Sequence, residues 1–128
     1  MPKQTLQLLD AKLTIHSLPR ESDIPSAVLS SDLYFIGKTA DEISIVCESQ
    51  IELDSEEQEP GWQALEVLGP LGFSLSGILS NISGVLASAN ISIFAISTFE
   101  TDYIMVKSLH MDDAIKALKK DGYKVLTS

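Results

Sequence analysis

Two polar segments in the second half of the chain contain residue types that could bind a small ligand. The first, residues 69–77, is rich in glycine and serine and leads into a pattern typical of a helix. Free backbone N–H groups at the start of a helix favour a small anion such as a carboxylate. The segment has no lysine and matches neither G-x-x-x-x-G-K-[ST] nor G-x-G-x-x-G, so a nucleotide-phosphate site is not indicated. The alternative is a tight turn whose serines cap the helix.

The second segment, residues 97–102, places hydroxyl groups and two carboxylates between two apolar stretches. Oxygen acceptors such as those of Glu100 and Asp102 could hold an ammonium or guanidinium group. An ordinary hairpin loop with polar side chains is the alternative, and the more common one.

The sequence contains few side chains of the types that catalyse reactions or bind metal ions. His16 and His110 are the only histidines, and they form neither H-x-x-x-H nor H-E-x-x-H. We expect His16 at an outward strand position and His110 just before a helix. Cys47 is the only cysteine, and it ends an apolar strand, where a buried and inert thiol is expected. No catalytic residue, metal or cofactor is therefore predicted.

The charge narrows the range of partners. The chain has 18 acidic and 9 basic residues, for a net charge of −9. Because nucleic-acid backbones and many membrane surfaces are anionic, neither is an expected partner. The N-terminus lacks a basic patch followed by an apolar run, and the apolar stretches end well before the about 18 residues of a membrane span. The expected location is the cytoplasm.

Apolar spacing predicts the elements that position the two polar segments. A strand is expected over residues 62–68, then a helix over 75–89 that Ser74 or Ser76 caps and Asn90 ends. There follow a buried central strand, a further strand, a short helix and a last strand, over residues 91–96, 103–107, 111–118 and 123–126. The order β-α-β-β-α-β predicts an α+β, ferredoxin-like fold with both helices on one face of a four-stranded antiparallel sheet.

The first half resembles a reduced copy of the same plan. Strands are predicted over residues 13–16, 33–38 and 43–47, and a four-residue turn favours a hairpin between the last two. Residues 54–61 hold four acids followed by Pro-Gly and are expected to be a solvated linker. The predicted division is therefore a truncated unit over 1–53, an acidic linker over 54–61 and a complete unit over 62–128.

Two other functions of ferredoxin-like folds fit poorly. An acylphosphatase needs an arginine in its first strand-to-helix loop, and residues 69–77 contain no cation. An RNA-recognition motif needs exposed aromatic and basic residues on its central strands, where this chain offers only Tyr103 and Lys107.

Several stretches resemble a known family. They are residues 62–65, 69–79 and 91–106, and the most specific is the run I-S-x-F-x-I-S-T-F-x-T-D-Y-I. They are similar to small bacterial ACT-domain proteins and to the ACT domains of the CASTOR-type arginine sensors, and residues 38–47 resemble the first half of the bacterial proteins. The resemblance implies a truncated ACT-like subdomain over 1–53 and a complete ACT domain over 62–128.

The resemblance also implies a ligand site, because ACT domains usually bind an amino acid between paired domains. A carboxylate would lie at the start of the first helix, and a cationic side chain would lie near Asp102. The residues that the resemblance and the two polar segments assign to this site are Gly72, Ser74, Leu75, Ser76, Gly77, Ser92, Ile93, Thr98, Phe99, Thr101 and Asp102.

The expected function is that of a non-enzymatic regulatory ACT protein, a ligand sensor that binds an amino acid and for which Asp102 favours a basic one. The arginine sensors join two complete units in one chain, whereas this chain holds one, so a homodimer is expected. The alternative is a module for protein–protein interaction or oligomerisation that binds no ligand. An enzyme is the weakest hypothesis.

Overall fold

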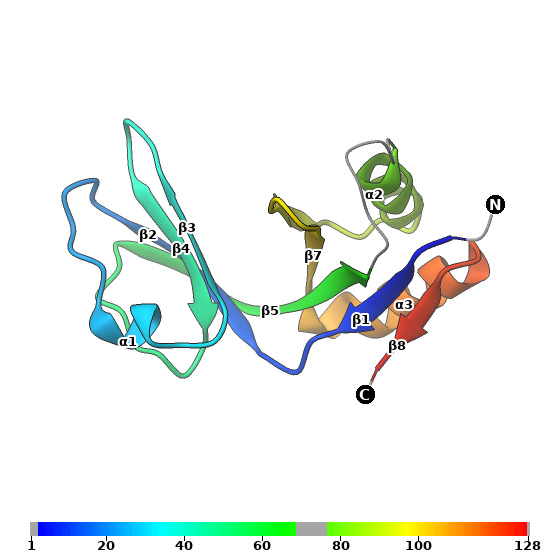
Figure 1. The fold of residues 1–128 in the computed structure, drawn as a ribbon, viewed down its shortest axis with the longest axis horizontal. Coiled ribbons are helices and arrows are strands. Elements are labelled where there is room, and N and C mark those ends of the chain that lie inside the picture. Colours follow the sequence, from blue (N-terminus) through cyan, green and yellow to red (C-terminus); the bar gives the residue numbers. More distant parts are fainter. Residues whose placement is uncertain (1–2, 69–76, 128) are drawn as a thin grey trace. The chain divides into compact units, whose positions relative to one another are not determined.

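The computed structural model describes residues 3–68 and 77–127, and the chain forms two compact units (Figure 1). The larger unit comprises Met1–Asp10 and Gln63–Ser128, and the smaller unit comprises Ala11–Trp62. The borders lie near residue 10 and inside strand β5 (Glu57–Leu68), which contributes its first half to the smaller unit and its second half to the larger one. They therefore differ from the predicted borders at residues 54–61.

The smaller unit is a sheet with one short helix. Its elements are β2 (Leu13–Leu18), α1 (Ser26–Leu29), β3 (Tyr34–Lys38), β4 (Ile43–Glu48) and residues 57–62 of β5. The strands are antiparallel in the order β3-β4-β2-β5. The predicted hairpin is confirmed: Lys38 pairs with Ile43, and the Thr39 hydroxyl accepts hydrogen bonds from the N–H groups of Asp41 and Glu42 at 3.1 and 3.2 Å.

The outward position predicted for His16 is wrong. His16 is 2% exposed and lies across from Ile45 of β4. Cross-strand partners share a face of the sheet, and the face that carries Ile43, Ile45 and Cys47 packs into the core of this unit. The register of β2 against β5 shifts between Leu13 and Ile15, so simple alternation from Leu13 assigns the wrong face.

The predicted acidic linker is partly a strand. β5 already begins at Glu57, which pairs with Ser17, and Gln58 pairs with His16. The side chains of residues 56–60 remain exposed as expected. Backbone pairing needs no apolar side chain, and charged residues with a proline are common on a sheet edge. Composition alone therefore could not separate this edge strand from a loop.

The larger unit is an α+β layer structure around a five-stranded sheet. Its elements are β1 (Thr5–Leu8), residues 63–68 of β5, α2 (Ile78–Ser88), β6 (Phe94–Ser97), β7 (Asp102–Lys107), α3 (Ser108–Lys120) and β8 (Lys124–Leu126). The strand order is β8-β1-β5-β7-β6. From β5 onward this confirms the predicted β-α-β-β-α-β order. The sheet is mixed rather than antiparallel throughout, because β1 lies between β5 and β8 and runs parallel to β8.

Both helices of the larger unit pack on one face of its sheet, as predicted. A single core joins Leu6 of β1 and Leu65 of β5 to Leu86 of α2 and Leu118 of α3, each with 0% exposure. The helix ends also follow the sequence in part. Asn90 ends α2 with a φ of 61°, and Gly122 follows α3 with a φ of 102°. Helix α2 starts after Gly77 without a side-chain cap, and the predicted caps Ser74 and Ser76 lie outside the described residues.

A strand is confirmed within the predicted range 91–96, but it begins later than predicted, and the predicted buried central position is wrong. Strand β6 begins at Phe94, and within the described residues it pairs only with β7. It is thus an edge strand, and Ala95 and Ser97 are exposed. Apolar β-rich composition is compatible with either position in a sheet, because propensity does not report the number of neighbouring strands.

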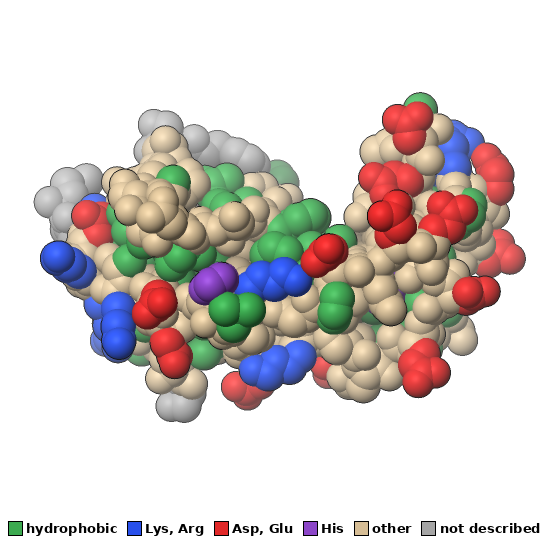
Figure 2. Space-filling view, turned by 180° about the vertical axis from the view of Figure 1, so that it is seen from behind, with side chains coloured by type: hydrophobic (Ala, Val, Ile, Leu, Met, Phe, Trp, Pro, Cys, Tyr) green, Lys and Arg blue, Asp and Glu red, His purple; other side chains and the backbone are tan. Residues whose placement is uncertain are grey.

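Charge is divided unequally between the two units. Residues 11–62 hold 11 acidic and 3 basic side chains, and the remaining residues hold 7 acidic and 6 basic ones. The formal charges are therefore −8 for the smaller unit and −1 for the larger one. Many of the acidic side chains are visible at the surface in Figure 2. The acidity that the sequence shows as a whole belongs almost entirely to the smaller unit.

Candidate functional site

The turn between β6 and β7 is closed by hydrogen bonds among its own hydroxyl groups. Ser97 pairs with Asp102 across the hairpin, and its Oγ donates to Asp102 Oδ1 at 2.6 Å. The N–H of Thr98 donates to the carbonyl of Thr101 at 2.8 Å, and the N–H of Thr101 donates to Thr98 Oγ1 at 3.2 Å. These bonds fix the backbone of the turn, and the bond from Ser97 to Oδ1 orients the Asp102 carboxylate.

Thr101 fastens this turn to the end of β5. Its Oγ1 donates a hydrogen bond to the carbonyl oxygen of Val67. The chain leaves β5 at Leu68 and enters residues 69–76, which lie outside the described residues, before Gly77 begins the approach to α2. The turn at 97–102 is therefore attached to the end of β5, at the level of Thr101 and Val67.

The structure separates the remaining predicted residues. Phe99 is 85% exposed at the tip of the turn. Ser92 is exposed and Ile93 packs against the core of the larger unit, and both precede β6, at the end of that strand away from the turn. Gly72, Ser74, Leu75 and Ser76 lie outside the described residues. The structure thus brings together Thr98, Thr101 and Asp102, but not Ser92 and Ile93.

Carboxylates dominate the electrostatics near the turn. The hydroxyl of Tyr103 donates to Glu66 Oε2 at 3.4 Å. Burial raises the pKa of Tyr103, and the charges of Glu66 and Glu100 raise it further. The sequence contains no lysine or arginine between Lys38 and Lys107. A ligand at this turn would therefore meet negative charge from Asp102 and Glu100, which favours a cationic group.

Sequence reasoning did not single out Glu66 and Tyr103. They lie 37 positions apart, and only the pairing of β7 with β5 brings them together. A local motif search cannot find such a pair, since neither side chain belongs to a polar segment.

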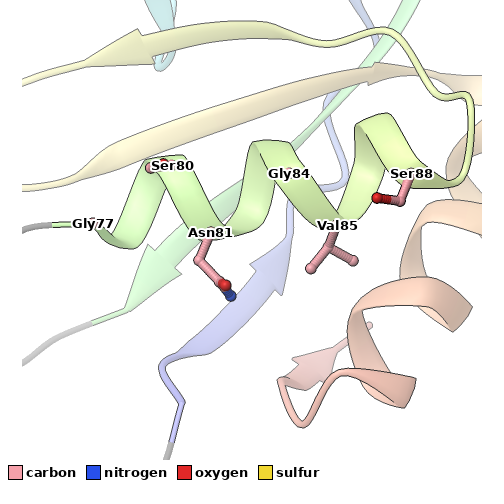
Figure 3. A pocket seen from close by; sticks show the side chains of 6 residues that line it. All are labelled: Gly77, Ser80, Asn81, Gly84, Val85 and Ser88. Atoms are coloured by element: carbon pink, nitrogen blue, oxygen red, sulfur yellow. The ribbon is translucent and has the colours of Figure 1, made fainter.

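A shallow depression follows the outer side of α2. The residues that line it are Gly77, Ser80, Asn81, Gly84, Val85 and Ser88, and Figure 3 shows the small side chains along this helix. Its volume is about 570 Å³, and it is open to solvent. None of the described residues that line it carries a charge or belongs to the turn at 97–102. Its chemistry suits contact with an uncharged surface better than enclosure of a polar ligand.

Two classes of site find no support in the described ranges. No three His, Cys, Asp or Glu side chains in residues 3–68 and 77–127 are grouped so that they could hold a metal ion. Among the helices described, none combines the length and apolar character needed to cross a bilayer.

The larger unit matches a known domain family. Residues 57–120, half of the chain, match the family model described as the ACT domain. The human cytosolic arginine sensor for mTORC1 subunit 1 is 32% identical over 130 residues, which cover 94% of this chain and 39% of that protein. The bovine counterpart is also 32% identical with the same coverage. The chain thus spans about two fifths of the length of these relatives.

Solved structures show the same fold. Protein Atu0741 from Agobacterium tumefaciens superposes with a TM-score of 0.91 and 29% identity, covering 100% of this chain and 96% of that one. The regulatory subunit of aspartate kinase from Thermus thermophilus has a TM-score of 0.58 at 12% identity, covering 90% of this chain and 93% of that one. At that identity the second match concerns the fold alone. With a family model over half its length and an ACT-type fold, this chain belongs to the ACT-domain family.

Proposed function

We propose that the chain is a non-catalytic regulatory protein that binds an amino acid, and that Asp102 favours a basic side chain. The observation that carries the proposal is the turn at 97–102, in which Ser97 orients Asp102 and Thr101 ties the turn to the end of β5. An oriented carboxylate near the end of β5 supports this proposal. The arginine sensor among its relatives supports the choice of a basic ligand.

The two ends of such a ligand would find different partners. The N–H groups at the start of α2 would suit the ligand's carboxylate, because this helix end carries partial positive charge. Asp102 has one oxygen engaged by Ser97 at 2.6 Å and would offer the other to an ammonium or guanidinium group. Gly77, Ser92 and Ile93, together with Gly72, Ser74, Leu75 and Ser76, complete the proposed ligand set, with Phe99 as an apolar contact.

We further propose that the site is formed between two copies of the chain in the cytoplasm. Ser92 and Ile93 lie away from the turn on the same chain, so one copy could supply the turn and another could supply the residues before β6. Strand β6 carries no charged side chain, and among the described strands it pairs with β7 alone, so we propose that a second copy docks along it. Sedimentation at micromolar concentration should then give a dimer, and a monomer that binds an amino acid with full affinity would contradict this.

A thermal-shift series tests the ligand. Arginine, lysine and citrulline, a neutral analogue of arginine, are added at millimolar concentration to the full chain. A ligand present at about 100 times its Kd stabilises the native state by about 2.7 kcal/mol. We expect the basic amino acids to raise the melting temperature more than citrulline does. If none of the standard amino acids shifts the transition, the sensing proposal fails.

The matched variants are Asp102→Asn and Asp112→Asn. Asp112 is exposed on α3, away from the turn, and its variant should leave ligand binding unchanged. Asp102→Asn keeps the size of the side chain and its bond to Ser97 but removes the charge. It should weaken arginine binding by at least about tenfold, which corresponds to the free energy of one charge-assisted hydrogen bond. It should change citrulline binding much less.

The second candidate is an interaction module without a ligand, favoured by the uncharged outer side of α2. It predicts no thermal shift with any amino acid, together with a loss of self-association when Gly84→Arg is introduced on this side of α2. Retention of the dimer in Gly84→Arg would remove the support for this candidate.

A further inference from the structure

After β4, residues 49–56 form a strap along β2 in the smaller unit. The N–H of Ser49 donates to the carbonyl of Lys12 at 2.8 Å, and the N–H of Glu56 donates to the carbonyl of Ser17 at 3.0 Å. Between these two ends, Ile51 and Leu53 pack against the core. The strap therefore closes the face of the sheet that holds the core of this unit, including Cys47, whose exposure is 0%.

Two side-chain bonds hold the strap to β2, and each joins it to a buried polar residue. Thr14 Oγ1 and Ser49 Oγ share a hydrogen bond of 2.8 Å, and His16 Nδ1 and Ser55 Oγ share one of 2.9 Å. Thr14 and His16 are 4% and 2% exposed. His16 Nε2 is buried and has no hydrogen-bond partner among the described residues. The closed strap thus provides a partner for one ring nitrogen of His16 and none for the other.

This geometry fits a neutral imidazole and conflicts with a charged one. An imidazolium has two N–H donors. A buried N–H without an acceptor destabilises the closed state by the full free energy of desolvation of that group. Burial lowers the pKa of His16, and no charge acts on it to offset that effect.

Among the described residues, no charge that would compensate a proton acts on His16. On β4 the titratable group of the covered face is Cys47, and burial raises the pKa of that thiol, which keeps it neutral. On β5 the residue across from His16 is the neutral Gln58, and the adjacent pairs place Glu57 across from Ser17 and Glu59 across from Ile15. The residues of α1 carry no titratable side chain.

The acids of the strap itself, Glu52, Asp54 and Glu56, are exposed. They lie in the same segment as Ser55. Once the strap has left β2, they and water can solvate a charged ring at His16. The open state therefore accepts a proton more readily than the closed state does.

We propose that residues 49–56 are a proton-operated strap: protonation of His16 releases them from β2 and exposes Cys47. The closed state is favoured at neutral pH and weakened on acidification. The pKa of His16 is lower in the closed state than in the open one. The free energy that favours the closed state is therefore largest at pH values above the ordinary histidine pKa. It is lost as pH falls through the closed-state value. The smaller unit would thereby respond to pH independently of any ligand in the larger unit.

Labelling of Cys47 with 4,4′-dithiodipyridine measures the opening, because this reagent reacts with thiols in mild acid. The rate is divided by that of the urea-unfolded chain at the same pH, which corrects for the chemistry of the thiol. We take the protection of Cys47 as the inverse of this corrected labelling rate. If only the open state binds the proton, with a pKa of about 6.5, acidification from pH about 7.5 to about 5 should lower that protection by up to about 30-fold.

The chain provides its own control because it has two histidines. His16→Asn keeps a side-chain group near Nδ1 for Ser55 and removes the titration, so its protection should not change with pH. His110→Asn, at an exposed position on α3, should keep the wild-type response. A pH response that survives in His16→Asn, or a wild-type protection that is flat over this range, would overturn the proposal.

Two further measurements keep the test decisive if His16→Asn does not fold. The NMR ring signals of His16 in the wild type should titrate below the ordinary histidine pKa. Titration at the ordinary value with Cys47 still protected would contradict the strap. Labelling at low pH should depend only weakly on urea, since a local opening exposes little surface. A dependence as steep as that of global unfolding would show that the whole chain opens, which also overturns the proposal.

Discussion

Asp121 joins three separate segments of the larger unit. Its Oδ2 accepts a hydrogen bond from Lys3 Nζ at 2.6 Å and one from Asn81 Nδ2 at 3.3 Å. Asn81 also donates to the hydroxyl of Tyr123, and Lys3 Nζ lies 5.1 Å from the centre of that ring. The segment before β1, helix α2 and the segment after α3 are thus held together by these side chains.

This cluster makes a prediction about acid stability. The bond from Lys3, followed by that from Asn81, lowers the pKa of Asp121 below its usual 3.8. A lowered native pKa stabilises the fold above the unfolded value, and the gain disappears as pH falls through the native one. Asp121→Asn should therefore be less stable than the wild type at pH about 6 in urea unfolding, and the two should converge below pH about 3. Asp113→Asn, at an exposed position on α3, is the control and should leave the stability difference between these pH values as in the wild type.

Two glycines should respond to alanine in opposite directions. Gly84 lies inside α2, and a Cβ there would meet nothing within 4 Å, so Gly84→Ala should stabilise the chain by about 1 kcal/mol through helix propensity. Gly122 has a φ of 102°, and Gly122→Ala should cost about 1–2 kcal/mol because L-residues avoid that region. Urea unfolding of both variants checks the pair, and equal signs would contradict this account of either site.

At the scale of elements, β1 is the feature that the sequence did not reveal. Residues 5–8 are too few for a periodic pattern, and the place of β1 between β5 and β8 depends on pairing with residues about as far away as the chain allows. By contrast, helices α2 and α3 and the β3–β4 hairpin were predicted correctly, since their signals lie within a few neighbouring residues. The edge position of β6 was missed for the same reason as β1.

Candidate-site prediction shows the same limit. The hydroxyl and carboxylate groups of the turn could be recognised because they are adjacent in sequence. The bond from Thr101 to Val67 and the pair of Tyr103 with Glu66 could not, because each depends on which strands are neighbours. Sequence patterns thus specify local chemistry, and the fold specifies which local groups meet.

The importance of β1 can be measured at Leu6. This side chain is 0% exposed and contacts the core shared with α2 and α3. Leu6→Ala should lower the free energy of unfolding by about 2–5 kcal/mol, as expected for a large core side chain. Leu29→Ala is the control, because Leu29 is 52% exposed. A loss below about 1 kcal/mol for Leu6→Ala would mean that β1 is dispensable to the core.

At the scale of the whole molecule, the charge of the smaller unit should make its stability sensitive to salt. Its formal charge of −8 derives from 11 acidic and 3 basic residues. Repulsion among these groups opposes the compact state, and salt screens it: the Debye length falls from about 30 Å at 0.01 M to about 8 Å at 0.15 M.

We therefore expect sodium chloride to raise the urea midpoint of the smaller unit. Trp62, the only tryptophan and 9% exposed, reports its unfolding by fluorescence. Potassium chloride should act equally, since screening depends on ionic strength and not on the identity of the cation. A midpoint that stays constant or falls with salt would show that the acids are too far apart to repel one another.

The strand order of the larger unit also bears on how the chain is made. Gln7 of β1 hydrogen-bonds Leu126 of β8 across 119 positions, and the whole smaller unit is encoded between β1 and the second half of β5. During synthesis the smaller unit can therefore fold on the ribosome before β8 has been made and can pair with β1. Contacts at such separation are formed slowly, so we expect the larger unit to become protease-resistant later than the smaller one. Chaperones would then be able to bind the nascent chain at β1 before this strand is paired with β8.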